Sequence, residues 1–127
     1  MVARLFVYGT LRSGNRPFDE FLSESALYVE PATLRDHALY GAGLAYPYVA
    51  VARGYTVVGE VVTIAARAWP DLAAVLDEYE GPEYTRVQVV VETSGGQVTA
   101  NSYRALPHID LDVANRIDSG DWMDRPP

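Results

Sequence analysis

The stretch YTVVGEVVTIAARAWPDLAAVLDEYEGPEYTRVQVVVET, residues 55–93, contains the patterns of a strand, a helix and a second strand in succession. Residues 55–64 are apolar and rich in β-branched side chains, which is typical of a strand, and only Gly59 interrupts the run. Residues 85–93 alternate along the chain, which places Val87, Val89 and Val91 on one face of a strand. This stretch therefore predicts a fold that mixes helix and strand.

The middle of this stretch, ARAWPDLAAVLDEYE, predicts an amphipathic helix. Its apolar residues recur at the helical positions i, i+3, i+4 and i+7, namely Leu72, Val75, Leu76 and Tyr79. Pro70 and Asp71 suit the first turn, and Gly81 followed by Pro82 ends the helix. We therefore expect the four apolar side chains to form the buried stripe.

The flanking sequence is mostly strand-like. ARLFVYG (3–9) predicts a buried strand, because aromatic and β-branched residues run up to a glycine. ALYVEPATLRDHALYG (26–41) predicts one or two short strands, with Pro31 at an edge or a bulge. Residues 43–54 predict a turn and then a strand, and QVTANSYRAL (97–106) completes a hairpin after the SGG turn.

Strands dominate these predictions, and only residues 18–25 add a second, short helix. At least one hairpin is antiparallel, and no regular alternation of strand and helix is present. The sequence therefore predicts an α+β fold: a small, mixed, mostly antiparallel β-barrel with a few flanking helices. A length of 127 residues without repeats or linkers predicts a single domain over residues 1–127.

The composition argues against several classes of function. The chain has no cysteine, which excludes disulfides, zinc–thiolate sites, iron–sulfur clusters and thiol nucleophiles. All ten basic residues are arginines, so no lysine can form a Schiff base, and two histidines argue against a His-rich metal site. A net charge of −7 with scattered arginines disfavours nucleic acid and anionic membranes. No apolar run approaches the ~20 residues of a membrane span and no signal-peptide pattern is present. We therefore expect a cytoplasmic protein.

Four carboxylates gather at the end of the predicted helix: Asp77, Glu78, Glu80 and Glu83. A helix C-terminus carries partial negative charge, which disfavours acids there. On a wheel of about 100° per residue, Glu80 falls about 40° from Leu76, at the edge of the apolar stripe. Burial, neighbouring acids and the helix end all raise a carboxyl pKa, as a general base near neutral pH requires. The alternative is that Glu80 pairs with an arginine such as Arg86. The other three acids are expected to be solvated or ion-paired.

The segment FVYGTLR (6–12) is the second candidate site, because a buried strand ends there in a turn. The turn comprises Tyr8, Gly9, Thr10 and Leu11. Successive backbone N–H groups in such a turn bind a carboxylate or a developing oxyanion. The alternative is an ordinary turn with Tyr8 packed in the core. Tyr103 either directs its hydroxyl into a site or belongs to the core, and Glu60 is either a second functional carboxylate or a solvent-facing one.

In chain order, the segments FVYGTLR, YPYVAVA, VVGEVV, LDEYEGPEYTR, SYRA and SGDW resemble the motifs of the gamma-glutamylcyclotransferase-like family. This family includes gamma-glutamylamine cyclotransferases and plant avirulence-induced proteins, and the motifs cover nearly the whole chain. The resemblance implies a compact mixed fold with a small β-barrel flanked by helices. It also implies the reaction, in which the α-amine of a γ-glutamyl amide attacks its own γ-carbonyl and releases 5-oxoproline and a free amine.

The resemblance further implies roles for individual residues. In the family, the Tyr-Gly-[Ser/Thr]-Leu turn binds the glutamyl end of the substrate and the glutamate of the LDxxEG segment is the acid/base. Glu80 matches the acid/base position, and Tyr103 matches a tyrosine that contacts substrate. The binding turn maps to Tyr8, Gly9, Thr10 and Leu11.

We therefore expect a cofactor-independent cyclotransferase, monomeric or homodimeric, that acts on a small-molecule γ-glutamyl amine or γ-glutamyl peptide. One alternative is a non-catalytic module of the same fold that binds a small metabolite. Another is a tailoring enzyme of secondary metabolism that removes a γ-glutamyl protecting group. We expect residues 12–20, residues 41–48 and the C-terminal tail to form the walls around the amine part of the substrate.

Overall fold

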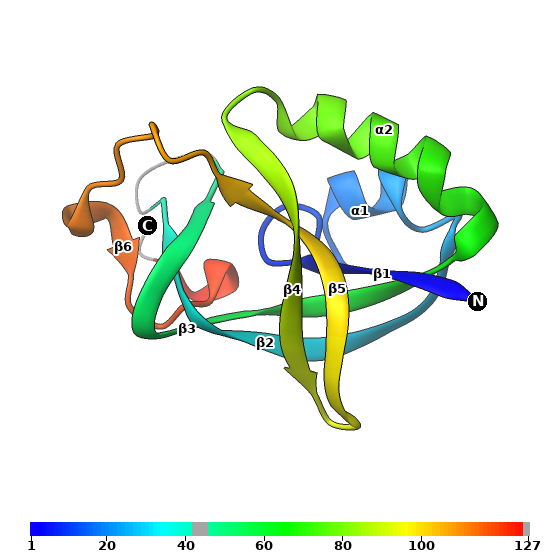
Figure 1. Ribbon diagram of the computed structural model, residues 1–127, viewed down its shortest axis with the longest axis horizontal. Helices are drawn as coiled ribbons and strands as arrows, with labels where there is room; N and C mark the ends of the chain where they lie inside the picture. The colour runs from blue at the N-terminus through cyan, green and yellow to red at the C-terminus, as the bar shows by residue number, and fades with distance from the viewer. Residues whose placement is uncertain (42–45, 126–127) are drawn as a thin grey trace.

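The computed structural model describes residues 1–41 and 46–125 (Figure 1). Six strands form one sheet: β1 (Val2–Val7), β2 (Ala26–Tyr40), β3 (Tyr48–Ala65), β4 (Tyr84–Thr93), β5 (Gly96–Ala105) and β6 (Arg116–Ile117). The two α-helices are α1 (Arg16–Phe21) and α2 (Trp69–Glu80), and short 3₁₀ turns span Ala66–Ala68, Val113–Asn115 and Trp122–Asp124. No helix in the described part of the chain is long and apolar enough to cross a membrane.

The sheet is ring-like. Its strand order is β3-β1-β5-β4-β2-β6, and β2 also pairs with β3, which joins the two sides of the sheet. Only the β1–β5 contact is parallel, and all other pairings are antiparallel. The predicted α+β class, with a mixed and mostly antiparallel sheet and a few outer helices, is therefore confirmed.

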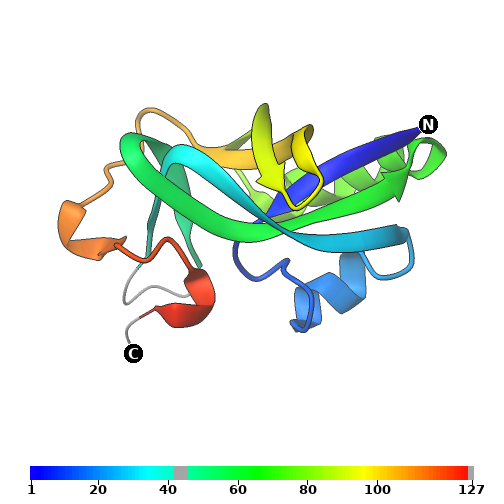
Figure 2. The same cartoon turned by 90° about the horizontal axis from the view of Figure 1, so that it is seen from below.

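The longest pairing joins β2 and β3, which run side by side as two curved ribbons (Figure 2). The sequence predicted shorter and separate strands here, and this was wrong. Two register shifts, between Ala26 and Tyr28 and between Arg35 and His37, let the strands bend without ending. Pro31 was predicted at an edge or a bulge; it lies within β2 opposite Glu60, away from both register shifts.

Side chains of β1 alternate between two hydrophobic clusters, as the period of a strand requires. Phe6 and Tyr8 join the cluster enclosed by the sheet, which also contains Trp122 near the C-terminus. Leu5 and Val7 join the cluster beneath the helices. That second cluster receives Phe18 and Leu22 from the α1 region and Leu72 and Leu76 from α2. The end of β1 therefore lies where both clusters meet.

Helix α2 ends at Glu80 as predicted, and Gly81 follows with a φ of 85°. The buried face differs from the predicted stripe, because Leu72, Ala73 and Leu76 are buried whereas Val75 is 46% and Tyr79 is 40% exposed. Leu72, Leu76 and Glu80 follow each other at intervals of four, so Glu80 continues the buried row. Glu80 thus lies on the buried face, not at its edge.

Candidate active site

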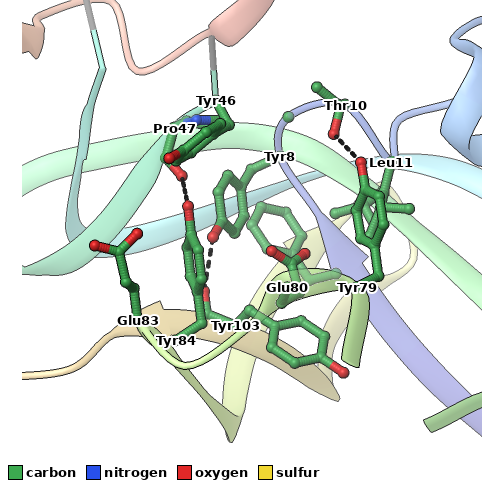
Figure 3. Close-up of a pocket in the computed structure, with 13 residues that line it drawn as sticks. Tyr8, Thr10, Leu11, Tyr46, Pro47, Tyr79, Glu80, Glu83, Tyr84 and Tyr103 are labelled. Carbon is green, nitrogen blue, oxygen red and sulfur yellow. Dashed lines mark hydrogen bonds between the residues drawn. The ribbon is translucent and has the colours of Figure 1, made fainter. Parts of the chain in front are cut away.

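A cavity of about 350 Å³ opens where the end of β1, the end of α2 and the start of β4 meet (Figure 3). Its walls combine apolar and aromatic side chains with two carboxylates. Thirteen of the described residues line it: Phe6, Val7, Tyr8, Gly9, Thr10, Leu11, Tyr46, Pro47, Tyr79, Glu80, Glu83, Tyr84 and Tyr103. The structure therefore brings all the sequence-predicted site residues to one cavity: Tyr8, Gly9, Thr10, Leu11, Glu80 and Tyr103.

Glu80 is the last residue of α2, and its partly buried side chain lines the cavity. Burial raises the pKa of Glu80 to about 7, because desolvation penalises the charged form. The predicted alternative, an ion pair with Arg86, is not formed. Arg86 instead binds Asp77, with 3.0 Å between Nε and Oδ1. Among the described residues no cation pairs with Glu80, so nothing opposes the effect of burial.

The turn after β1 is held in place from two sides. The Tyr8 hydroxyl donates to the backbone carbonyl of Tyr103 at 2.9 Å, so Tyr8 is packed in the core and also lines the cavity. A Cβ atom on Gly9 would lie 2.6 Å from Cγ of Pro47, so only glycine fits between β1 and that proline. The backbone N–H of Arg12 donates to the backbone carbonyl of Gly9 at 3.1 Å and closes the turn.

The backbone N–H groups of Gly9, Thr10 and Leu11 have no acceptor among the described residues. Buried backbone N–H groups almost always have a hydrogen-bond partner. Donors at a cavity wall that have no partner in the protein are therefore available to a ligand. The Thr10 side chain lies 3.1 Å from the Tyr79 hydroxyl, which connects the turn to α2 (Figure 3). The turn therefore presents backbone donors near the Glu80 carboxylate.

Tyr103 is among the residues that line the cavity, but its hydroxyl donates to Oδ1 of Asp77 at 2.5 Å. Burial raises the pKa of Tyr103 well above its usual range, and the hydrogen bond to Asp77 raises it further. Asp77 also binds Arg86, as expected for an ion-paired acid. Both polar groups of Tyr103 named here thus have partners within the protein: its backbone carbonyl accepts the Tyr8 hydroxyl, and its own hydroxyl is bound to Asp77.

Four tyrosines near the cavity were missed by the sequence analysis as parts of the site. Tyr46, Tyr79 and Tyr84 line it, and Tyr48 stacks on Tyr84 with ring centroids 5.2 Å apart. The Tyr84 hydroxyl donates to the Pro47 carbonyl at 2.7 Å. In the sequence, these tyrosines are marked only by lying inside YPYVAVA and LDEYEGPEYTR, two of the segments that resemble family motifs.

Glu83 was expected to be solvated or ion-paired, but it lines the cavity and accepts the Tyr48 hydroxyl at 2.7 Å. Glu60 neither lines the cavity nor faces solvent freely. Its two oxygens accept the N–H and the hydroxyl of Ser13, each at 2.6 Å, and so fix the loop after the turn. Of the two cavity carboxylates, sequence reasoning singled out Glu80 and not Glu83.

The predicted walls are found only in part. Tyr46 and Pro47 come from the expected segment 41–48, of which residues 42–45 lie outside the described residues. No lining residue comes from the described parts of 12–20 or of the C-terminal tail. Within residues 1–41 and 46–125, no three His, Asp or Glu side chains gather into a group that could hold a metal ion.

Comparison with known proteins connects this cavity to a family. The family model described as "Gamma-glutamyl cyclotransferase, AIG2-like" matches residues 5–124. A search of curated proteins finds no match. Among solved structures, YkqA from Bacillus subtilis is 30% identical with a TM-score of 0.71, and the match covers 96% of this chain and 40% of that one. This chain therefore spans two fifths of the length of YkqA.

Two further structures show the same fold at lower identity. A protein named gamma-glutamyl cyclotransferase is 20% identical with a TM-score of 0.65, over 84% of this chain and 68% of that one. An AIG2-like protein from Mus musculus is 20% identical with a TM-score of 0.59, over 98% and 84% of the two chains. The family match extends over almost the entire chain, and it includes every residue of the cavity. This protein belongs to the gamma-glutamyl cyclotransferase, AIG2-like family.

Proposed function

We propose that the protein is a cyclotransferase that converts a γ-glutamyl amine or γ-glutamyl peptide into 5-oxoproline and a free amine. The observation that carries this proposal is the position of Glu80. It is a partly buried carboxylate with a pKa of about 7, in the same cavity as the turn at Tyr8–Leu11. Family membership supports the same type of reaction.

Glu80 acts first as a base. The α-amino group of a γ-glutamyl compound is protonated near neutral pH and cannot attack until it loses a proton. A carboxylate with a pKa of about 7 accepts that proton at lower cost than an ordinary glutamate, because its pKa lies closer to that of the amine. An ordinary glutamate with a pKa of about 4.3 would be a far weaker base.

The free α-amine then attacks the γ-carbonyl carbon of the same molecule. A carbon–nitrogen bond forms and closes a five-membered ring, and the carbonyl oxygen becomes an oxyanion. The bond to the leaving amine breaks as Glu80 returns its proton to that nitrogen. The ring nitrogen then gives its second proton to Glu80, which leaves 5-oxoproline with one N–H and a free amine. No water is consumed and the scheme needs no bound cofactor. Because nucleophile and carbonyl are tethered, the protein has mainly to orient them and move the proton.

The turn after β1 has two tasks in this scheme. Its free backbone N–H groups at Gly9, Thr10 and Leu11 bind the glutamyl end of the substrate. They also provide donors for the oxyanion, and such donors typically contribute about 3–4 kcal/mol each to transition-state stabilisation. The close approach of Gly9 to Pro47 keeps these donors in place without a ligand.

The direct test is release of 5-oxoproline from a panel of γ-glutamyl amines and γ-glutamyl peptides. Glu80→Gln keeps the shape of the side chain and removes the base, and Glu78→Gln on the exposed side of α2 is the matched control. We expect wild type and Glu78→Gln to release 5-oxoproline and Glu80→Gln to lose activity. Full activity in Glu80→Gln would remove Glu80 from the mechanism. Ligand-induced thermal stabilisation of the wild type without turnover would instead indicate a binding module.

A further inference from the structure

The cavity has two ends with different side chains. One end holds Glu80 and the turn that we assign to the glutamyl group. The other end holds Glu83, with Tyr84 beside it (Figure 3). In Figure 3 the Tyr84 ring lies between the Glu80 and Glu83 side chains. If the glutamyl group is bound at the first end, the leaving amine extends toward the second.

Glu83 is a carboxylate without a cation. One of its oxygens accepts the Tyr48 hydroxyl at 2.7 Å. Within residues 1–41 and 46–125, no Arg or His pairs with Glu83, and its second oxygen has no hydrogen-bond partner. A partly buried carboxylate gains most from a partner of opposite charge, which replaces the water it has lost.

Aromatic side chains lie on one side of this carboxylate: Tyr48 donates its hydroxyl to it, and the Tyr84 ring lies beside it (Figure 3). Tyr84 stacks on Tyr48 at an interplanar angle of 13°, and Tyr46 meets Tyr48 edge-on with centroids 5.9 Å apart. The hydrogen bond from the Tyr84 hydroxyl to Pro47 holds the Tyr84 ring in position. The faces of such rings attract cations through their quadrupole. Glu83 and the rings therefore favour the same kind of ligand group.

The cavity also disfavours the opposite charge. Its thirteen described lining residues include two glutamates and no arginine, lysine or histidine. A carboxylate on the amine part of a substrate would meet Glu83 with no cation among the described lining residues to compensate, and two like charges repel each other. The net charge of −7 adds a weaker field of the same sign.

Resting on the cyclotransferase function proposed above, we infer that the cavity selects γ-glutamyl compounds whose amine part carries a positive charge, with Glu83 as the specificity-determining residue. A γ-glutamyl diamine has this chemistry. Its α-amine and γ-carbonyl lie at the Glu80 end, and its second ammonium group lies against Glu83 and Tyr84. Peptides with a free terminal carboxylate, such as γ-glutamyl dipeptides, are disfavoured.

The test uses three compounds of nearly equal length: γ-glutamyl cadaverine, which is cationic, γ-glutamyl pentylamine, which is neutral, and γ-glutamyl aminohexanoate, which is anionic. We expect kcat/KM for 5-oxoproline release to fall in that order, by about tenfold from cationic to neutral, the size of a charge-assisted hydrogen bond. In Glu83→Gln the ratio of cationic to neutral substrate falls toward one. Glutamine still accepts the Tyr48 hydroxyl, and Glu78→Gln controls for loss of one surface charge.

Binding separates this inference from the proposed function. Calorimetric titration of the Glu80→Gln protein with the same three compounds measures their affinities, and so the charge preference, without turnover. If no compound is turned over but the binding order holds, the cyclotransferase proposal fails and the charge preference stands. If all three are turned over with equal kcat/KM, the cyclotransferase proposal stands and the charge preference is overturned. A preference that survives Glu83→Gln unchanged would remove Glu83 from its cause.

Discussion

The two faces of the last turn of α2 carry carboxylates in opposite environments. Asp77 accepts the Tyr103 hydroxyl and pairs with Arg86. Burial alone would raise the pKa of Asp77, but these two partners outweigh it and lower the pKa. Glu80, three residues later, faces the cavity without a cation among the described residues, and burial raises its pKa to about 7.

This difference shows that the face of a helix, not its end, sets the strength of an acid here. Both carboxylates lie near the same helix C-terminus and experience the same unfavourable dipole. Asp77 points toward β4 and β5, which supply Arg86 and Tyr103. Glu80 follows Leu72 and Leu76 on the buried face. One turn of helix therefore carries a carboxylate whose pKa is lowered and another whose pKa is raised to about 7.

The largest effect is expected when the Glu80 carboxylate is removed. We expect Glu80→Gln to lower kcat/KM for 5-oxoproline release by about 10²- to 10⁴-fold, the usual contribution of general acid–base catalysis. Steady-state kinetics with the best substrate of the panel measures it. Asp77→Asn removes a carboxylate from the other face and should cost far less, because Asp77 does not line the cavity. Equal losses in the two variants would contradict the division between the faces.

The second prediction concerns stability and pH. The pKa of Glu80 is about 7 in the folded chain and about 4.5 in the unfolded chain, so the folded state binds the proton more tightly. The contribution of Glu80 to the free energy of unfolding is therefore fully present below pH 4.5 and is lost as the pH rises through 7. Glutamine does not titrate. Glu80→Gln should thus be more stable than wild type by about 2 kcal/mol at alkaline pH, reduced from the fully buried value by partial exposure.

Urea unfolding at several pH values measures this difference. We expect the curves of wild type and Glu80→Gln to converge as the pH falls toward 4.5 and to separate through neutrality. Glu78→Gln, on an exposed position of the same helix, should follow wild type at every pH. Parallel curves for wild type and Glu80→Gln would show that Glu80 has an ordinary pKa in the folded protein.

The sequence contains enough information to locate Glu80 but not to describe its surroundings. Helical spacing identified α2 and its end, and the strand-to-glycine pattern identified the turn at Tyr8–Leu11. The stripe was misassigned at Val75 and Tyr79, since α2 is covered by the sheet on one side only. Apolar spacing alone does not reveal which flank of a helix stays open to solvent.

The second end of the cavity was beyond local reasoning. Tyr48 and Glu83 are thirty-five positions apart, and only tertiary folding brings the hydroxyl of one to the carboxylate of the other. The same holds for Pro47 and Tyr84. The long strands β2 and β3 were missed because their register shifts look like strand boundaries in the sequence. Local patterns specify elements, whereas these contacts depend on how the bent strands meet.

A smaller effect is expected when the Tyr103 hydroxyl, which binds Asp77, is removed. Tyr103→Phe removes the hydrogen bond to Asp77 and keeps the ring and the backbone carbonyl that accepts Tyr8. We expect the free energy of unfolding to fall by about 1 kcal/mol, the net value of one hydrogen bond. Since the hydroxyl is bound to Asp77, kcat/KM should change by less than about threefold, or ~0.6 kcal/mol. A large rise in KM would place this hydroxyl on the substrate, as the family resemblance implies.

The smallest expected effect tests whether Arg86 influences Glu80 through the ion pair that the sequence offered as an alternative. In the structure Arg86 pairs with Asp77 near the surface, and its guanidinium lies over the Trp69 ring at 5.6 Å. We expect Arg86→Gln to lower the free energy of unfolding by about 0.5 kcal/mol, as is usual for an exposed pair. The pH midpoint of activity should stay at about 7, because Arg86 does not stabilise the ionised form of Glu80. A midpoint that rises in Arg86→Gln would mean that Arg86 holds Glu80 ionised, and the contrast between the two faces of α2 would then disappear.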